Sequence, residues 1–133
     1  MNAHGTVDAE HDVIVVGSGA GGMAAALTAA HHGLDVLVVE KDAHIGGSTA
    51  ISGGAVWIPQ NPHLAEVGLS DSRQAVTSYL RAILGNRYRS DMIEAFLDAG
   101  PRMVAFFEQH TEVAFAPRAV SPDYQPDLPG AAA

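Results

Sequence analysis

The stretch that decides the fold of this chain is residues 12–40, DVIVVGSGAGGMAAALTAAHHGLDVLVVE. Its apolar run 13–16 predicts a strand of a parallel sheet, since such strands are covered on both faces and lack polar alternation. Gly17, Gly19 and Gly22 follow the run directly and fit G-x-G-x-x-G, the dinucleotide-binding fingerprint. We expect Gly17 to allow the sharp turn, Gly19 to let a pyrophosphate approach the backbone, and Gly22 to let the helix pack closely on the sheet.

An alanine-rich segment follows the glycines and predicts a helix over residues 23–32, which Gly33 ends in a left-handed conformation. The N-terminus of this helix would present N–H groups and a partial positive charge to phosphates. A second strand is predicted over residues 35–39, and Glu40 follows it. An acid about 20 residues beyond the glycines can accept hydrogen bonds from a ribose hydroxyl and would repel a 2′-phosphate, which argues against NADP. The stretch therefore predicts a β-α-β dinucleotide-binding unit, the start of a Rossmann-like α/β fold.

The composition argues against several classes of function. The chain has 133 residues, of which 47% are hydrophobic, and its net charge of −8 argues against a nucleic-acid surface. It contains no cysteine, which excludes disulfides, thiolate metal sites and thiol catalysis, and we predict no metal site. The polar N-terminus, residues 1–11, has no signal-peptide pattern and is predicted to be disordered. We predict no transmembrane segment, so a cytoplasmic location is the default expectation.

The domain organisation is predicted from where the strand pattern stops. Only two good strands precede the change of pattern, whereas a doubly wound sheet needs several. We expect a nucleotide-binding part over residues 12–60 and a helical segment over residues 61–133 that begins an incomplete remainder. The chain is thus expected to be the N-terminal piece of a longer protein, or a truncated product. A complete small domain is the alternative, but an isolated two-strand unit would leave apolar faces uncovered.

A second glycine-rich segment follows Glu40 and reads KDAHIGGSTAISGGAVWIP over residues 41–59. Its Gly-Gly-Ser-Thr portion can present N–H groups and hydroxyls as an anion-binding concavity. Ser48 or Thr49 could cap a short helix whose N-terminus faces the same pyrophosphate. The later glycine pair would let the backbone approach a flat ring closely. A flexible surface loop without a ligand is the alternative.

Together, GSGAGG at 17–22 and EKDAHIGGSTAISGGAVWIP at 40–59 resemble the FAD-binding segment of the fumarate reductase/succinate dehydrogenase flavoprotein superfamily. Within it, they are most similar to 3-ketosteroid Δ1-dehydrogenases. The resemblance implies FAD as the cofactor, with Glu40 on the adenosine ribose and the loop 48–54 running toward the isoalloxazine. It implies FAD contacts at Gly17, Gly19, Ala20, Gly21, Gly22, Glu40, Lys41, Gly47, Ser48, Thr49, Ser52, Gly53 and Gly54.

The second half of the chain is predicted to be mainly helical. Its apolar spacing predicts three amphipathic helices, over residues 71–84, 91–99 and 101–110. We expect Ser70 or Ser72 to cap the first helix and Ser90 to cap the second. Gly100 is expected to end the second helix, with Pro101 in the first turn of the third. A short apolar strand over residues 113–115 precedes a proline-rich, irregular tail.

The resemblance continues through this half, on SYLRAILG at 78–85, GPRM at 100–103 and PDY at 122–124. It implies that Tyr124 lies at the active site and assists the catalytic base. The implied reaction removes a proton beside a 3-keto group and transfers a hydride to flavin N5, which creates the C1–C2 double bond. The base itself and the carbonyl-polarising group find no match in these residues. From composition alone, Tyr124 is a tyrosine in a proline-rich loop, and a packing role stays open.

Three hypotheses of function follow. The first is an FAD-dependent oxidoreductase that desaturates a 3-ketosteroid, with an electron acceptor that the sequence does not identify. The second is another FAD oxidoreductase of the same superfamily, which an arginine-rich dicarboxylate site would favour. The third is a truncated product that binds nucleotide weakly or binds nothing, and that catalyses nothing.

Overall fold

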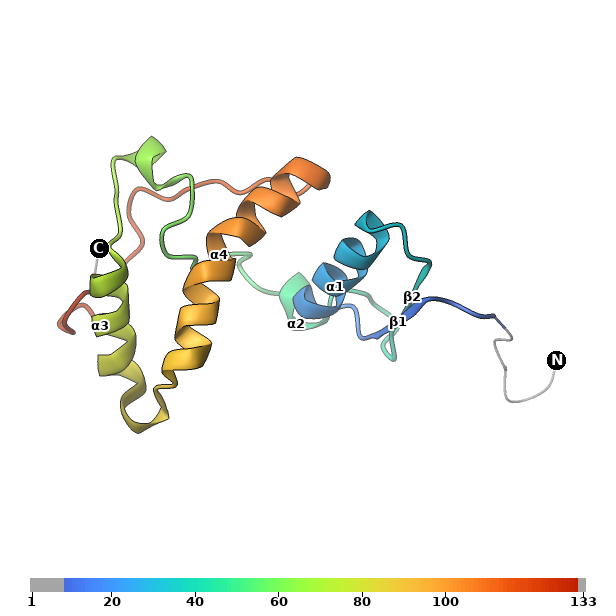
Figure 1. The fold of residues 1–133 in the computed structure, drawn as a ribbon, viewed down its shortest axis with the longest axis horizontal. Helices are drawn as coiled ribbons and strands as arrows, with labels where there is room; N and C mark the ends of the chain where they lie inside the picture. Colours follow the sequence, from blue (N-terminus) through green and yellow to red (C-terminus); the bar gives the residue numbers. More distant parts are fainter. Residues whose placement is uncertain (1–8, 132–133) are drawn as a thin grey trace. The chain divides into compact units, whose positions relative to one another are not determined.

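A computed structural model describes residues 9–131 as two compact units, one ending at Val56 and the other beginning at Trp57 (Figure 1). The first unit contains β1 (Val13–Val16), α1 (Ala20–His31), β2 (Val36–Val39) and α2 (Gly47–Ala50). The second contains the 3₁₀ turns η1 (Leu64–Val67) and η2 (Gly85–Arg87) and the helices α3 (Arg73–Leu84) and α4 (Ser90–His110). We predict disorder for residues 1–11, and residues 1–8 of that segment lie outside the described residues. The α/β class, a β-α-β start followed by helices, is confirmed.

In the first unit, β1 and β2 pair in parallel, with Val13 opposite Val36 and Val16 opposite Val39. Helix α1 connects the two strands and covers one face of the pair, where Val15 is buried. On the opposite face, Ile14 and Val16 are 59% and 83% exposed. A parallel strand with one bare apolar face is unusual, because parallel sheets are normally covered on both sides.

The glycine turn between β1 and α1 shows why α1 begins at Ala20, earlier than predicted. The Met23 amide donates to the Gly19 carbonyl at 2.9 Å, so the glycines themselves form the first helical turn. A Cβ on Gly22 would lie 1.9 Å from the Gly17 carbonyl oxygen, so the close packing expected at Gly22 is present. Gly33 has φ of 81° after the last helical turn, as predicted.

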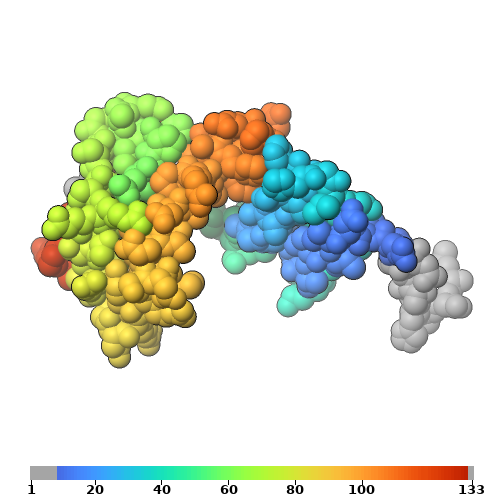
Figure 2. Space-filling model, in the orientation of Figure 1, coloured from blue at the N-terminus to red at the C-terminus, as the bar shows by residue number. Residues whose placement is uncertain are grey.

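In the second unit, α3 and α4 form a hairpin joined by η2 (Figure 1). Val76 and Leu80 of α3 pack with Leu97 of α4 to form its buried core. In the space-filling view, α3 (yellow-green) lies directly against the first half of α4 (yellow to orange) (Figure 2). Ser72 caps α3, because its hydroxyl accepts the Ala75 amide at 3.1 Å. Of the two serines predicted as alternatives for this cap, Ser70 and Ser72, the structure therefore has Ser72.

The predicted break at Gly100 is wrong, because α4 runs through it as one helix of 21 residues with Pro101 inside. Gly100 is buried, and a Cβ there would lie 3.0 Å from the Ile58 side chain, so this glycine serves close packing. Proline removes one N–H from the helical ladder, which leaves only the Leu97 carbonyl without its usual donor. Leu97, Val104 and Phe107 are all buried, so one apolar stripe continues across the proline and holds the helix together.

Two smaller predictions are also wrong. Arg89 is the cap residue of α4 and Ser90 is its first helical residue, so Ser90 does not cap the helix. No strand forms over residues 113–115 in the described chain, since no second strand lies beside it to complete a ladder. The Phe115 amide instead donates to the Glu108 carboxylate at 3.1 Å.

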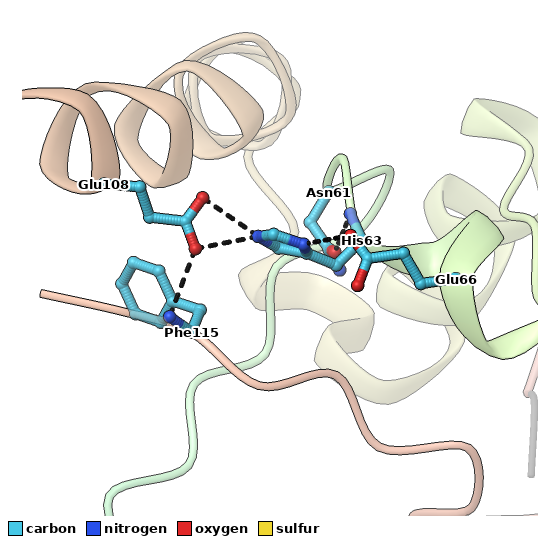
Figure 3. Close-up of polar contacts among 5 residues, drawn as sticks. All are labelled: Asn61, His63, Glu66, Glu108 and Phe115. Atoms are coloured by element: carbon cyan, nitrogen blue, oxygen red, sulfur yellow. Dashed lines mark hydrogen bonds and ion pairs between the residues drawn. The ribbon is translucent and has the colours of Figure 1, made fainter.

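His63 joins three segments of the second unit (Figure 3). Its Nδ1 lies 2.6 Å from Glu66 Oε1 in η1, and its Nε2 lies 2.8 Å from Glu108 Oε1 in α4. Glu108 also accepts the Phe115 amide, so the cluster reaches the segment after α4. The hydrogen bond to Glu66 is the largest cause that raises the pKa of His63, and the hydrogen bond to Glu108 is the second. Both raise it because both ring nitrogens must carry protons to donate to two carboxylates.

Among the described residues, no helix has the length and apolar character needed to cross a membrane.

Candidate nucleotide-binding site

The turn after β1 leaves open space above its glycines. Gly17 has φ of 95°, in the left-handed region, and its amide donates to the Val39 carbonyl at 2.7 Å. A Cβ built on Gly17 or Gly19 would meet no atom within 4 Å, so neither glycine is required by packing against the protein. The first amides of a helix have no acceptor within it, so those of Gly19, Gly21 and Gly22 can bind an anion.

Glu40, just after β2, reaches back to this turn. Its Oε2 accepts the Ser18 amide at 2.9 Å and the Ser18 hydroxyl at 2.7 Å, and its Oε1 accepts the Asp42 amide at 3.0 Å. These hydrogen bonds, the Ser18 hydroxyl first, lower the pKa of Glu40 to about 2. Oε1 accepts one of these three hydrogen bonds and Oε2 accepts two, so Oε1 is the oxygen better placed to accept a ribose hydroxyl as well.

Ser18 is the residue that the sequence reasoning missed. It is only 2% exposed, and besides binding Glu40 its hydroxyl accepts the Gly46 amide at 2.8 Å. One buried side chain thus ties the first glycine turn to the carboxylate and to the second glycine segment. The sequence did contain a signal for this role of Ser18, namely a hydroxyl between Gly17 and Gly19 followed by an acid after the next strand. The signal is weak, because the fingerprint allows many residue types at the position of Ser18.

The second glycine segment folds against the N-terminus of α1. Gly47 lies next to Gly19, since a Cβ on Gly47 would be 3.4 Å from the Gly19 Cα. Thr49 Oγ1 accepts the Ala20 amide at 3.2 Å, so this threonine caps α1 from 29 residues away. The prediction that Ser48 or Thr49 caps the short helix is wrong, because α2 starts after Gly46 and contains both residues.

The rest of this segment is exposed and held by its own hydrogen bonds. Ser52 Oγ donates to the Thr49 carbonyl at 3.0 Å and accepts the Gly54 amide at 3.1 Å. Gly54 has φ of 73°, and a Cβ on Gly53 would meet no atom within 4 Å. The side chain of Lys41, also exposed, makes no hydrogen bond or ion pair within the described residues.

Chemically, this donor set suits the diphosphate of a dinucleotide. The positions of Gly17 and Gly19 are open and Gly47 adjoins Gly19, so no side chain of these three residues stands beside the amides and the positive partial charge at the start of α1. Glu40 supplies an acceptor beside it. Within residues 9–131, no group of three or more His, Asp or Glu side chains is arranged to hold a metal ion.

Tyr124 lies in the second unit, in an irregular segment after α4. Tyr124 is 98% exposed, so it has no packing role within the described part of the second unit. The preceding residue, Asp123, accepts a hydrogen bond from the Tyr79 hydroxyl of α3. Tyr124 therefore projects from a backbone segment that is attached to a helix.

Comparison with known proteins agrees with this geometry. The family model described as "FAD binding domain" matches residues 12–130. A 3-oxosteroid 1-dehydrogenase of Mycobacterium tuberculosis H37Rv is 50% identical over 121 residues, which cover 91% of this chain and 22% of that protein. A 4-oxocyclohex-2-ene-1-carboxylate 5-dehydrogenase of Sinomonas cyclohexanicum is 49% identical over 90% of this chain and 20% of its own length.

A solved structure is also similar. The 3-ketosteroid Δ1-dehydrogenase of Sterolibacterium denitrificans, in complex with 1,4-androstadiene-3,17-dione, matches with a TM-score of 0.83 and 43% identity. The match covers 92% of this chain and 21% of that one. The chain therefore spans about a fifth of the length of the relatives it matches. It belongs to the FAD-binding domain family, and within that family it is similar to the 3-oxosteroid 1-dehydrogenases, as the sequence predicts.

Proposed function

We propose that this chain supplies the first FAD-binding part of a dehydrogenase that introduces a double bond between C1 and C2 of a 3-ketosteroid. The observation that carries the proposal is the Ser18 network, which holds two glycine segments and Glu40 together at the N-terminus of α1. The 50% identity to a 3-oxosteroid 1-dehydrogenase supports the substrate class.

Each predicted contact has a specific role in this proposal. The open surface at the start of α1 receives the diphosphate; its residues are Gly17, Gly19, Ala20, Gly21, Gly22 and Gly47. Oε1 of Glu40 accepts a hydroxyl of the adenosine ribose, with Lys41 beside it. The exposed segment of Ser48, Thr49, Ser52, Gly53 and Gly54 follows the cofactor from the diphosphate toward the isoalloxazine.

FAD, when bound, supplies the oxidising power by accepting a hydride from the substrate carbon. The residues of this chain bind and orient it, and they keep side chains away from the diphosphate. Tyr124 donates a hydrogen bond to the catalytic base and so favours the anionic form of that base. Its full exposure leaves its hydroxyl available for this contact.

A smaller cyclic ketone is the second candidate substrate. The Sinomonas relative, whose name specifies 4-oxocyclohex-2-ene-1-carboxylate, is nearly as similar to this chain as the mycobacterial steroid enzyme. Both names describe dehydrogenation of a ring that carries a ketone. The two candidates therefore share the chemistry and differ in the size and charge of the substrate.

The test uses the protein expressed from its complete gene and a dye as electron acceptor. We expect a yellow protein that reduces the dye with androst-4-ene-3,17-dione, the C1–C2 saturated counterpart of the steroid in the Sterolibacterium structure. Turnover with 4-oxocyclohex-2-ene-1-carboxylate but not with the steroid would favour the second candidate. Reduction of the dye with succinate alone, or a colourless protein, would contradict both.

A further inference from the structure

One side-chain oxygen of Asp123, the residue before Tyr124, links helix α3 to the residue after Tyr124. Asp123 Oδ1 accepts the Tyr79 hydroxyl of α3 at 2.6 Å and the Gln125 amide at 2.7 Å. The residue before Tyr124 is thus fixed to a helix, and the residue after it is fixed to the same oxygen. Tyr124 between them is 98% exposed.

The tail beyond Tyr124 is also held against α3. A Cβ on Gly130 would lie 2.2 Å from the Ala75 carbonyl oxygen and 3.2 Å from the Tyr79 amide, so the backbone passes directly over the helix. The tail, drawn in red, runs beside α3 in the ribbon view (Figure 1). Between the two attachments, the Leu128 amide donates to the Gln125 carbonyl at 3.2 Å and closes a turn. The segment that carries Tyr124 is therefore attached at both ends.

Tyr79 is itself a fixed support. Its ring packs against the core of the second unit and lies 6.1 Å from the Trp57 ring in an edge-on arrangement. The hydrogen bond to Asp123 raises the pKa of Tyr79, and the same bond lowers the pKa of Asp123. The donor therefore stays protonated and the acceptor stays charged at neutral pH, so the contact persists under assay conditions.

We propose that Tyr79 and Asp123 are positioning residues that fix the direction in which the Tyr124 side chain projects toward the reacting groups. The inference rests on the proposed role of Tyr124. An exposed tyrosine on a mobile segment would spend much of its time away from a partner, and small displacements of a positioned group cost large factors in rate. Anchoring the flanking backbone removes that freedom without burying the hydroxyl.

The test compares variants of the protein expressed from its complete gene, with androst-4-ene-3,17-dione and a dye acceptor. Tyr79→Phe removes the donor and keeps the ring, and we expect kcat to fall about tenfold while KM, FAD content and melting temperature change little. Tyr88→Phe is the matched control, because that half-buried tyrosine has no hydroxyl hydrogen bond within residues 9–131 and packs under Arg81.

Variants of Asp123 test the same hydrogen bond from the loop side. They separate a loss of positioning from a folding defect that a change of Tyr79 in the core could cause. Asp123→Asn keeps an oxygen that can accept both hydrogen bonds, and we expect most of kcat to survive. Asp123→Leu keeps the size and removes the acceptor, and it is expected to lose as much kcat as Tyr79→Phe. In the double variant Tyr79→Phe/Tyr124→Phe, kcat should fall no further than in Tyr124→Phe alone, because both changes act through one group.

Three outcomes overturn the inference. Unchanged kcat in Tyr79→Phe and Asp123→Leu, with Tyr124→Phe strongly impaired, rejects the positioning role and leaves the proposed function standing. Additive losses in the double variant also reject it, since Tyr79 would then act elsewhere. Full activity of Tyr124→Phe rejects both the role of Tyr124 and the positioning that depends on it.

Discussion

At the scale of single residues, the hydrogen-bonding side chains of Ser18 and Glu40 hold the candidate site together, which the glycines of the fingerprint have no side chains to do. The glycines leave space, whereas Ser18 fixes three backbone segments through one hydroxyl and one amide. Glu40 is consequently a structural acceptor as well as a candidate ribose ligand. A carboxylate with a depressed pKa stabilises the fold above its unfolded-state pKa and loses that contribution as pH falls through the folded-state value.

Replacing Ser18 by alanine removes the largest cause of the depressed pKa of Glu40. We expect that pKa to rise from about 2 toward its ordinary value of 4.5, measured by the pH dependence of the Glu40 carboxyl ¹³C shift. In the unaltered protein, stability should fall as pH drops from about 4.5 to about 2, and less so in Ser18→Ala. An unchanged titration of Glu40 in the variant would contradict the network.

Gly22 and Gly21 form a matched pair of stability tests. Alanine at Gly22 would place a Cβ 1.9 Å from the Gly17 carbonyl oxygen, whereas at Gly21 it would meet no atom within 4 Å. We expect Gly22→Ala to lower the free energy of unfolding by about 1–3 kcal/mol or more. Gly21→Ala should raise it by up to about 1 kcal/mol, because alanine favours the helix. Equal changes in the free energy of unfolding for the two variants, measured by urea titration, would contradict the close packing at Gly22.

At the scale of elements, the second unit is held by the hairpin of α3 and α4 and by the charged His63 cluster (Figure 3). The apolar stripe of α4 explains why a glycine and a proline in sequence do not end that helix. Sequence rules treat Gly100 and Pro101 as a stop, but burial of Leu97, Val104 and Phe107 along one face outweighs the single lost hydrogen bond.

The His63 cluster predicts a loss of stability with rising pH. Because the folded-state pKa of His63 is raised, its contribution is fully present below the ordinary value of 6.5 and is lost as pH rises through the folded-state pKa. We expect the urea midpoint to fall above about pH 6.5, and His63→Gln to remove that dependence.

His44→Gln is the control for this prediction, since the His44 side chain is 93% exposed and, within residues 9–131, its one ion pair is with Asp42, at 3.5 Å. This variant should keep the pH dependence of the unaltered protein. A pH dependence that persists in His63→Gln would place its cause in another group.

The sequence was sufficient for those parts of the fold that local patterning determines. The β-α-β start, Gly33 and the Ser72 cap follow from periodicity and turn chemistry. The long-range links were not predictable in this way: Thr49 caps a helix 29 residues away, and Ser18 binds Gly46 across 28 residues. Such contacts depend on how segments meet in space, which a local pattern does not specify.

At the scale of the whole molecule, the two-strand sheet has an apolar face that no described residue of the first unit covers. Ile14 and Val16 of β1 are exposed there, next to a glycine turn that otherwise suits a diphosphate. A sheet of two strands gives little independent stability, so the turn needs further support to hold its geometry.

We therefore expect residues 1–133, expressed alone, to retain little FAD. The absorbance spectrum of the purified chain should show flavin bands well below the intensity of one FAD per chain, because an uncovered sheet face weakens the turn that we propose for the diphosphate. A yellow protein with one FAD per chain would contradict this expectation and would show that the described residues suffice.

The most direct test of the central claim, that two glycine segments enclose the diphosphate of FAD, is FAD binding by Gly19→Val in the protein expressed from its complete gene. Gly19 has φ of −67° and ψ of 177°, which valine adopts readily, and a Cβ there meets no protein atom within 4 Å. We predict an unchanged melting temperature of the FAD-free protein and a loss of FAD affinity on the order of 100-fold. Stoichiometric FAD in Gly19→Val at unaltered affinity would contradict the account.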